Sequence, residues 1–319
     1  NPLLATKEAE LANLTVVHGE WVNLDKPGGQ VFFVADSTSG GTYPTAYKGK
    51  GSSGSNNGLS PQKPINGVTT GTTDGFNALM DKCVSGRGDT IVVLPGSIIN
   101  TAVVTVDVAD LTITGISPSG SINPSAIVVN ATVDGFNVTA ANVVLENLHF
   151  GASTAAATSR INAGAAGLTI RGCTFDCGAN DVESITVPAA GDDLLVENCR
   201  FYVTANGPDA AIEIEAAGAE RLTVRNCVFS GDSETNKWDA GAINSGVAHT
   251  GCLIDNNIFW EGLAVEFTAA ATGTICRNFA GEGATLGQAF DTGSCMCFEN
   301  YEADAVDQSG RLFPTTVAS

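Results

Sequence analysis

Residues 194–201 read LLVENCRF, and the same eight-residue pattern recurs along the chain. It runs apolar, any residue, apolar, charged, Asn or Gly, small or apolar, any residue, Phe. Clear copies cover 143–150, 168–175, 222–229 and 252–259, and weaker ones lie at 111–115, 276–278 and 298–300. Counted from Asn147, the Asn/Gly position returns after 25, 26, 28, 30, 22 and 22 residues. That spacing is typical of one coil of a β-solenoid with loops of variable length.

A second apolar stretch precedes most copies of the pattern. These stretches cover residues 135–138, 185–187, 212–214, 242–244, 265–267 and 289–291. Each alternates with period two, as a strand with one buried face does. We therefore expect at least two strands in every coil.

The residue before the Asn/Gly position carries a charge whose sign alternates from coil to coil. The series is Glu146, Arg171, Glu197, Arg225, Asp255, Arg277 and Glu299. Equivalent residues of a parallel stack lie about 4.8 Å apart on one face. The alternation predicts an outward ladder of opposite charges, in which each exposed pair contributes at most about 1 kcal/mol.

Three other positions of the pattern predict features of the interior and of the bends. Asn and Gly tolerate a left-handed backbone, so a sharp bend is expected at 115, 147, 172, 198, 226, 256, 278 and 300. The Phe residues at 150, 175, 201, 229 and 259 should form an inward aromatic stack, and Cys173, Cys199 and Cys227 should be buried free thiols. A catalytic or glycan-binding role for the Asn and Phe positions is the less favoured alternative.

Between about Val31 and Tyr301 the chain resembles the pectate-lyase-like superfamily of right-handed parallel β-helix proteins. The resemblance implies an all-β fold, a right-handed single-stranded parallel β-helix of about eight coils with a short N-terminal capping α-helix. Thr73-Asp74 can cap that helix, expected near residues 74–85, with an apolar face at 76, 79, 80 and 83 and an end at Gly86 or Gly88. Residues 1–30 and 302–319 lack the repeat and are expected to be an attachment arm and a C-terminal tail.

Charge and cysteine content restrict the partners and the compartment. The chain has 15 Lys and Arg against 34 Asp and Glu, a net charge of -19, which disfavours nucleic acids and anionic membranes. No apolar run approaches the roughly 20 residues of a membrane span, and the start does not look like a secretion signal. The nine cysteines show no paired CxxC motifs. We expect free thiols, assembly in a reducing cytoplasm, and no metal or cofactor.

The sequence offers only a small set of candidate catalytic residues. His18, His149 and His249 are scattered, and His149 falls inside the repeat as one rung of the stack. The best acidic candidates are Glu213, Glu215 and Glu266. Glu213 and Glu266 should lie two coils apart, on the order of 10 Å, near the upper end of the separation in inverting glycosidases. Solvated surface glutamates are the favoured interpretation.

Two segments are similar in style to the β-helical particle proteins of tailed bacteriophages: the entry segment, at residues 31–36 and 59–64, and the closing segment, from residues 297–301 through 311–314. This resemblance implies a non-enzymatic virion structural protein, a capsid-decorating protein or surface appendage made in the host cytoplasm. A homotrimer is expected, with a major capsid protein as partner and a host-surface glycan as a further contact. The first alternative is a polysaccharide lyase or glycoside hydrolase, like a tailspike depolymerase, and the second is a secreted adhesin.

Overall fold

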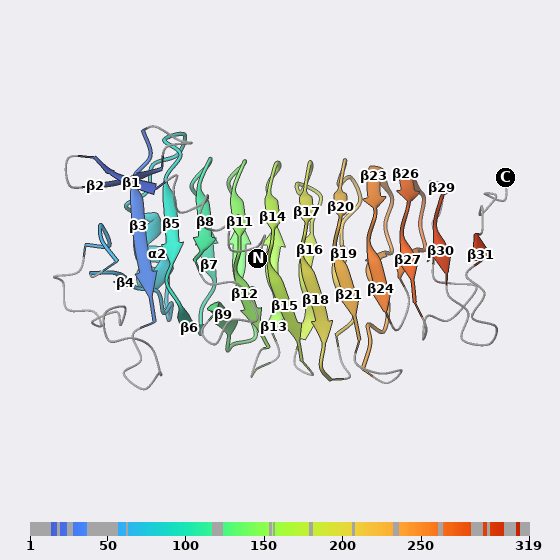
Figure 1. The fold of residues 1–319 in the computed structure, drawn as a ribbon, viewed down its shortest axis with the longest axis horizontal. Coiled ribbons are helices and arrows are strands. Elements are labelled where there is room, and N and C mark those ends of the chain that lie inside the picture. The colour runs from blue at the N-terminus through green and yellow to red at the C-terminus, as the bar shows by residue number, and fades with distance from the viewer. Residues whose placement is uncertain are drawn as a thin grey trace.

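The chain folds as an all-β parallel solenoid, an elongated stack of coils whose strands form three long sheets (Figure 1). The structure is a computed structural model. It describes residues 14–17, 20–23, 28–36, 57–61, 63–116, 124–152, 155, 157–178, 181–205, 208–231, 236–260, 264–281, 290–291, 294–302 and 311–312.

The three sheets are named here I, II and III. Sheet I contains, in spatial order, β4 (Ile65–Asn66), β3 (Val31–Ala35), β5 (Thr90–Val93), β8 (Thr112–Gly115), β11 (Val144–Glu146), β14 (Thr169–Arg171), β17 (Leu195–Glu197), β20 (Thr223–Arg225), β23 (His249–Asp255), β26 (Ala271–Cys276) and β29 (Met296–Phe298). Sheet II contains β6 (Gly96–Asn100), β9 (Ser125–Val129), β12 (His149–Gly151), β15 (Thr174–Cys177), β18 (Arg200–Val203), β21 (Val228–Ser230), β24 (Ile258–Trp260), β27 (Phe279–Ala280), β30 (Tyr301–Glu302) and β31 (Arg311–Leu312). Sheet III contains β7 (Val104–Val106), β10 (Phe136–Val138), β13 (Ala157–Ala163), β16 (Asp181–Val187), β19 (Ala210–Ile214), β22 (Gly241–Ser245), β25 (Val265–Phe267) and β28 (Phe290–Asp291).

Each coil contributes one strand to each sheet. Eight triplets follow one another, from β5, β6 and β7 to β26, β27 and β28, so the chain makes about seven turns from the first triplet to the last. Every described pairing within the three sheets is parallel except that of β30 with β31, which is antiparallel. The predicted parallel solenoid is confirmed, whereas its right-handed sense stays a prediction.

Two columns of left-handed residues produce the bends on either side of sheet I. The column after the strands has φ between 54° and 60° and consists of Asn147, Gly172, Asn198, Asn226, Asn256, Arg277 and Glu299. The second column contains Asp110, Asn142, Gly167, Asp193 and Arg221, each two residues before its strand, and Gly251 within β23. The first column divides the eight-residue pattern into a strand of sheet I and a strand of sheet II. Three predicted bends are wrong. Gly115 has no left-handed φ and is the last residue of β8, and in the coils of Asn278 and Asn300 the left-handed conformation belongs to Arg277 and Glu299.

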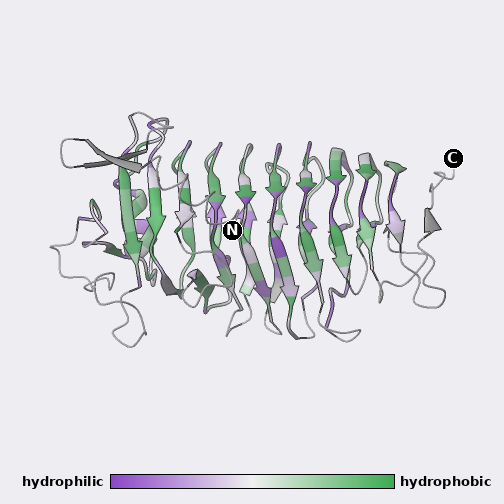
Figure 2. Ribbon diagram, viewed as in Figure 1, coloured by the Kyte–Doolittle hydropathy of each residue, from purple (hydrophilic) through white to green (hydrophobic). Residues whose placement is uncertain are grey.

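Apolar rows fill the interior of the solenoid. Figure 2 shows hydrophobic residues along the strands of successive coils, and the predicted Phe stack is confirmed. The rings of Phe150, Phe175, Phe201, Phe229 and Phe259 are stacked with successive centroids 4.9, 4.6, 4.8 and 4.9 Å apart. The predicted thiols of Cys173, Cys199 and Cys227 are buried and free, and they lie in the next interior row.

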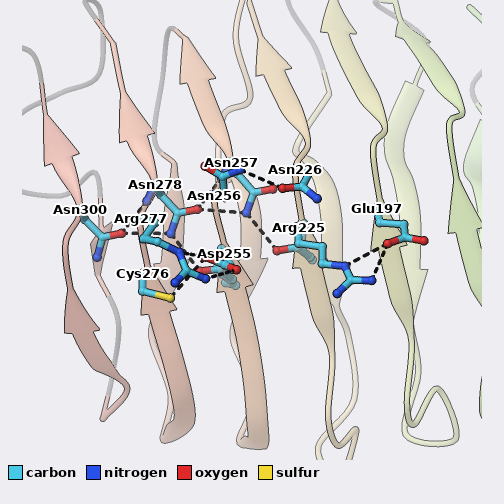
Figure 3. Close-up of polar contacts among 12 residues, drawn as sticks. Glu197, Arg225, Asn226, Asp255, Asn256, Asn257, Cys276, Arg277, Asn278 and Asn300 are labelled. Carbon is cyan, nitrogen blue, oxygen red and sulfur yellow. Dashed lines mark hydrogen bonds and ion pairs between the residues drawn. The ribbon is translucent and has the colours of Figure 1, made fainter. Parts of the chain in front are cut away.

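That row changes from apolar to amide side chains toward the C-terminus. After Leu148 and the three cysteines it continues with Asn257, Asn278 and Asn300, all buried. Asn257 donates its backbone N–H to Asn278 Oδ1 at 2.9 Å, and Asn278 does the same to Asn300 at 3.0 Å (Figure 3). The side-chain amide of Asn278 donates to the carbonyl of Ile254 at 2.9 Å. Each Asn thus joins neighbouring coils through buried hydrogen bonds, which the sequence-based register did not predict.

The predicted charge ladder is confirmed over five coils. Glu146, Arg171, Glu197, Arg225 and Asp255 follow one another in register on sheet I. The described ion pairs join Arg171 to Glu146 at 2.6 Å and Arg225 to Glu197 at 2.7 Å. The ladder therefore consists of separate pairs.

The last two coils depart from the predicted register by one residue. Asp255 lies opposite Cys276, and Cys276 lies opposite Phe298. The predicted strand positions of Arg277 and Glu299 are therefore wrong. Arg277 nevertheless reaches Asp255 from the bend, with Nε 2.8 Å from Oδ1 (Figure 3).

A short helix packs against the N-terminal part of the core. Helix α2 covers Gly75–Met80, so the expected range of 74–85 is too long. Its Phe76 and Leu79 are buried, and Phe76 meets the ring of Phe136 at 5.5 Å. Asp74 is the residue before the helix, but its carboxylate accepts backbone N–H groups of Thr70 and Gly71 upstream and does not cap the helix. The role of α2 as the cap of the solenoid stays a prediction.

The two expected terminal segments are described only in part. An antiparallel pair, β1 (Leu14–Val17) and β2 (Glu20–Asn23), lies within residues 1–30. Strand β31 lies within residues 302–319 and pairs with β30. Their functions as an attachment arm and a tail stay predictions.

Candidate functional site

A row of polar residues crosses sheet III, one residue per coil. In register it contains Asn137, Asn162, Thr186, Glu213, Asn244 and Glu266. Glu213 lies between the buried Ile212 and Ile214, so strand alternation turns its side chain to the outer side. Glu213 and Glu266 are two coils apart with Asn244 between them, as predicted, which corresponds to about 10 Å of backbone separation.

Glu183 lies near this row and has the most perturbed carboxyl group of the site. It belongs to β16, in the coil next to Glu213, and is half-buried. Burial raises the pKa of Glu183 to about 7, and the negative charges of Glu215, Asp209 and Glu213 add to the rise. The predicted candidate Glu215 follows β19 directly and is exposed. The structure therefore brings Glu213 and Glu215 into one electrostatic cluster with Glu183 and Asp209.

Glu213 is held by a side-chain hydrogen bond from the next coil. Asn244 donates its amide Nδ2 to a carboxylate oxygen of Glu213 at 2.7 Å. Burial raises the pKa of Glu213, the hydrogen bond from Asn244 opposes that rise, and the charges of Glu215, Asp209 and Glu266 add to it. The Glu213 carboxylate thus has a fixed hydrogen-bond partner.

A carboxylic acid that titrates near neutral pH beside ionised carboxylates can exchange protons with a bound substrate. Glu183 has that property, and Glu215, Asp209 and Glu213 supply the nearby negative charges. Two residues of this site, Glu183 and Asn244, are not predicted by the residue pattern. Glu183 shares the parity of the buried Ile185 and Val187, so strand alternation alone does not place it with Glu213. Asn244 carried no signal, because its role depends on pairing with a strand one coil away.

The two histidines within the described ranges do not join the carboxylates described above. His149 occupies a rung of sheet II, as predicted, and its Nε2 lies 3.2 Å from Asp176 Oδ2. His249 is buried at the start of β23, its Nδ1 lies 3.3 Å from the carbonyl oxygen of Val247, and burial lowers its pKa. His18 lies outside the described residues.

The cysteines are dispersed along the solenoid as thiols. All nine are free, and Cys252 Sγ lies 3.6 Å from Cys295 Sγ. Within the described ranges, no three His, Cys, Asp or Glu side chains are arranged to hold a metal ion. No helix in the described part of the chain is long and apolar enough to cross a membrane.

No protein-family model, curated protein or solved structure matches the chain. The function is therefore argued from the geometry and chemistry of the described residues.

Proposed function

We propose that the chain is a non-enzymatic structural protein of a bacteriophage virion, a capsid-decorating protein or surface appendage. In this role the solenoid is a projecting spacer, and the terminal segments attach it to other subunits such as a major capsid protein. Assembly takes place in the host cytoplasm before the protein joins the particle. Membership of the pectate-lyase-like superfamily is part of the same proposal.

The observation that carries the proposal is the continuous side-chain stack along the axis of the solenoid. Five Phe rings lie at intervals of 4.6 to 4.9 Å, and buried Cys and Asn side chains form a second row beside them. A close-packed interior keeps the distance between the two ends fixed, as a spacer requires. The eleven strands of sheet I, spaced at about 4.8 Å, make a rod of roughly 48 Å. The nine free thiols suit assembly in a reducing compartment.

Attachment can be tested by removing residues 1–30. The full chain and the truncated chain are each co-expressed with the major capsid protein of the encoding genome, and particles are then isolated by sedimentation. We expect the truncated protein to keep its β-type circular dichroism but to be absent from the particles. Particles that carry the truncated protein at the full-length level would show that the arm is not the attachment segment.

A second candidate function, polysaccharide cleavage, is favoured by one observation, the raised pKa of Glu183 in the electrostatic cluster with Glu215, Asp209 and Glu213. Host-surface polysaccharide is incubated with the purified chain, and new reducing ends and unsaturated sugar products are measured. The structural proposal predicts no product. Cleavage that is abolished by both Glu183→Gln and Glu213→Gln, and retained by Glu220→Gln as a control on an exposed turn, would replace the structural proposal with the enzymatic one.

A further inference from the structure

The outer face of sheet II carries a strip of exposed apolar side chains over its C-terminal coils. One row consists in register of Arg200, Val228, Ile258, Phe279 and Tyr301. The parallel row consists of Tyr202, Ser230, Trp260 and Gly281. Ile258, Trp260 and Tyr301 are 38, 42 and 40% exposed. Large apolar side chains exposed next to one another are typical of interaction surfaces.

The strip keeps its aromatic side chains in fixed positions. The indole of Trp260 meets Phe279 edge to face, with ring centroids 5.5 Å apart. It also lies against the backbone of Gly281, where a Cβ atom would be only 2.0 Å from the ring. At the other end, the guanidinium of Arg200 lies 5.4 Å from the centre of the Tyr202 ring. Such preordered side chains lose little rotamer entropy when a partner covers them.

The charges of the chain restrict what can cover this strip. None of its nine residues is acidic, although the chain has a net charge of -19. Sheet III carries Glu183, Glu213 and Glu266, and sheet I carries the charge pairs. Two copies of so acidic a chain would repel each other through sheet III. The strip is a face on which they can approach without placing carboxylates opposite one another.

The row from Arg200 to Tyr301 is complementary to the same row of a second copy that runs in the opposite direction. When two strips face each other with their solenoid axes antiparallel and a two-fold axis at Ile258, Val228 meets Phe279 of the second copy. Arg200 then meets the ring of Tyr301, a favourable cation–π arrangement. Ile258 meets its own equivalent at the centre. We propose that the strip is a self-association surface that pairs two copies of this chain about a two-fold axis.

The size of the strip determines how tightly the copies can bind. Five rungs at about 4.8 Å span roughly 19 Å, and the two rows lie about 7 Å apart along the strands. This is smaller than the roughly 800 Å² per partner of a standard stable interface. The pair should therefore be a reversible dimer that forms as the protein concentration rises. The two-fold order favours a dimer over the trimer expected from the sequence, and the inference is independent of the proposed role in a virion.

Sedimentation equilibrium of the purified full chain over a concentration series tests the proposal. Ile258→Asp places two carboxylates opposite each other at the two-fold axis. Ile99→Asp is the matched control, because Ile99 is 41% exposed on β6, at the other end of sheet II. We expect the wild type and Ile99→Asp to shift from monomer to dimer with rising concentration, and Ile258→Asp to stay monomeric with unchanged circular dichroism. Added salt should strengthen the wild-type dimer, because it screens the repulsion between two acidic chains.

Several results would overturn the proposal. A chain that stays monomeric over the whole series, or that forms a trimer, does not pair about this axis. Equal loss of dimer in Ile99→Asp and Ile258→Asp would assign the effect to added charge and not to the strip. A monomeric chain that binds a soluble oligosaccharide, and loses that binding in Ile258→Asp, would make the strip a glycan-binding surface.

Discussion

Asn278 provides a direct test of the buried amide row, because its side chain satisfies two backbone groups that have no access to water. It is fully buried, its amide donates to the Ile254 carbonyl at 2.9 Å, and its Oδ1 accepts the Asn257 N–H at 2.9 Å. Asn278→Ala leaves both groups without these partners. An unsatisfied buried polar group costs about 1 to 3 kcal/mol, so we expect a loss of about 2 to 6 kcal/mol in the free energy of unfolding.

Urea unfolding followed by far-ultraviolet circular dichroism measures this loss. With a denaturant dependence of about 3 kcal/mol per molar urea, the midpoint of Asn278→Ala should fall by roughly 1 to 2 M. The control is Asn226→Gly, at an exposed bend with φ 55°, because the same column of left-handed residues already contains a glycine, Gly172. Gly adopts this conformation freely, so the control should lose less than about 1 kcal/mol. Equal midpoints for Asn278→Ala and the wild type would refute the reasoning, because the amide row would then contribute nothing.

Four further predictions concern the core, the charge pairs and two titrating groups. Phe201→Ala removes the middle ring of the stack, which is fully buried, and should lower the free energy of unfolding by about 3 to 5 kcal/mol in the same urea assay. A loss below about 1 kcal/mol would contradict a packed stack. Arg225→Glu places a like charge between the carboxylates of the two neighbouring coils and should cost only about 1 kcal/mol, decreasing with salt, because the pair is partly exposed. Burial lowers the pKa of His249, so the imidazole is neutral in the folded chain at neutral pH. Its contribution to the free energy of unfolding should be fully present above the ordinary pKa of 6.5 and should be lost as the pH falls below that value. His249→Phe should remove that part of the pH dependence of the melting temperature. The pKa of Glu183 is raised to about 7, so the folded chain should lose stability as the pH rises from about 4.5 to 7. Above pH 7, Glu183→Gln should therefore melt at a higher temperature than the wild type. An equal or lower melting temperature would contradict the raised pKa.

Most of the fold could be predicted from the repeat because its physical causes are local. An apolar residue at every second position determines which face of a strand is buried, and a residue tolerant of φ near 55° determines where a bend can form. The positions of Glu213 and Glu266 in one row of sheet III follow from the same counting. The residue pattern predicts at least two strands per coil, and the structure has three, because the bend inside the eight-residue pattern divides it between sheets I and II.

The register of the last coils could not be determined from the residue pattern. Asn is suited both to an exposed left-handed bend, as Asn256 shows, and to a buried hydrogen-bonded row, as the adjacent Asn257 shows. A single Asn, such as Asn278, satisfies either pattern. Its place is decided by pairing between coils, because only the stacked structure brings the Ile254 carbonyl within reach of its amide.

The candidate site likewise combines features that follow from residue spacing with features that depend on stacking between coils. The residue pattern alone predicts the strands, the inward aromatic and thiol rows and the alternation of charge, because each depends on residues a fixed number of positions apart. Stacking of the coils is what brings Glu183 into the electrostatic field of Glu215, Asp209 and Glu213, and what assembles the exposed strip of Ile258, Trp260 and Tyr301. These groups come from different coils joined by loops of variable length. Their proximity depends on how the coils stack. Burial and the charges of neighbouring groups then determine the pKa of Glu183, and the stacking determines which side chains of the strip stay exposed.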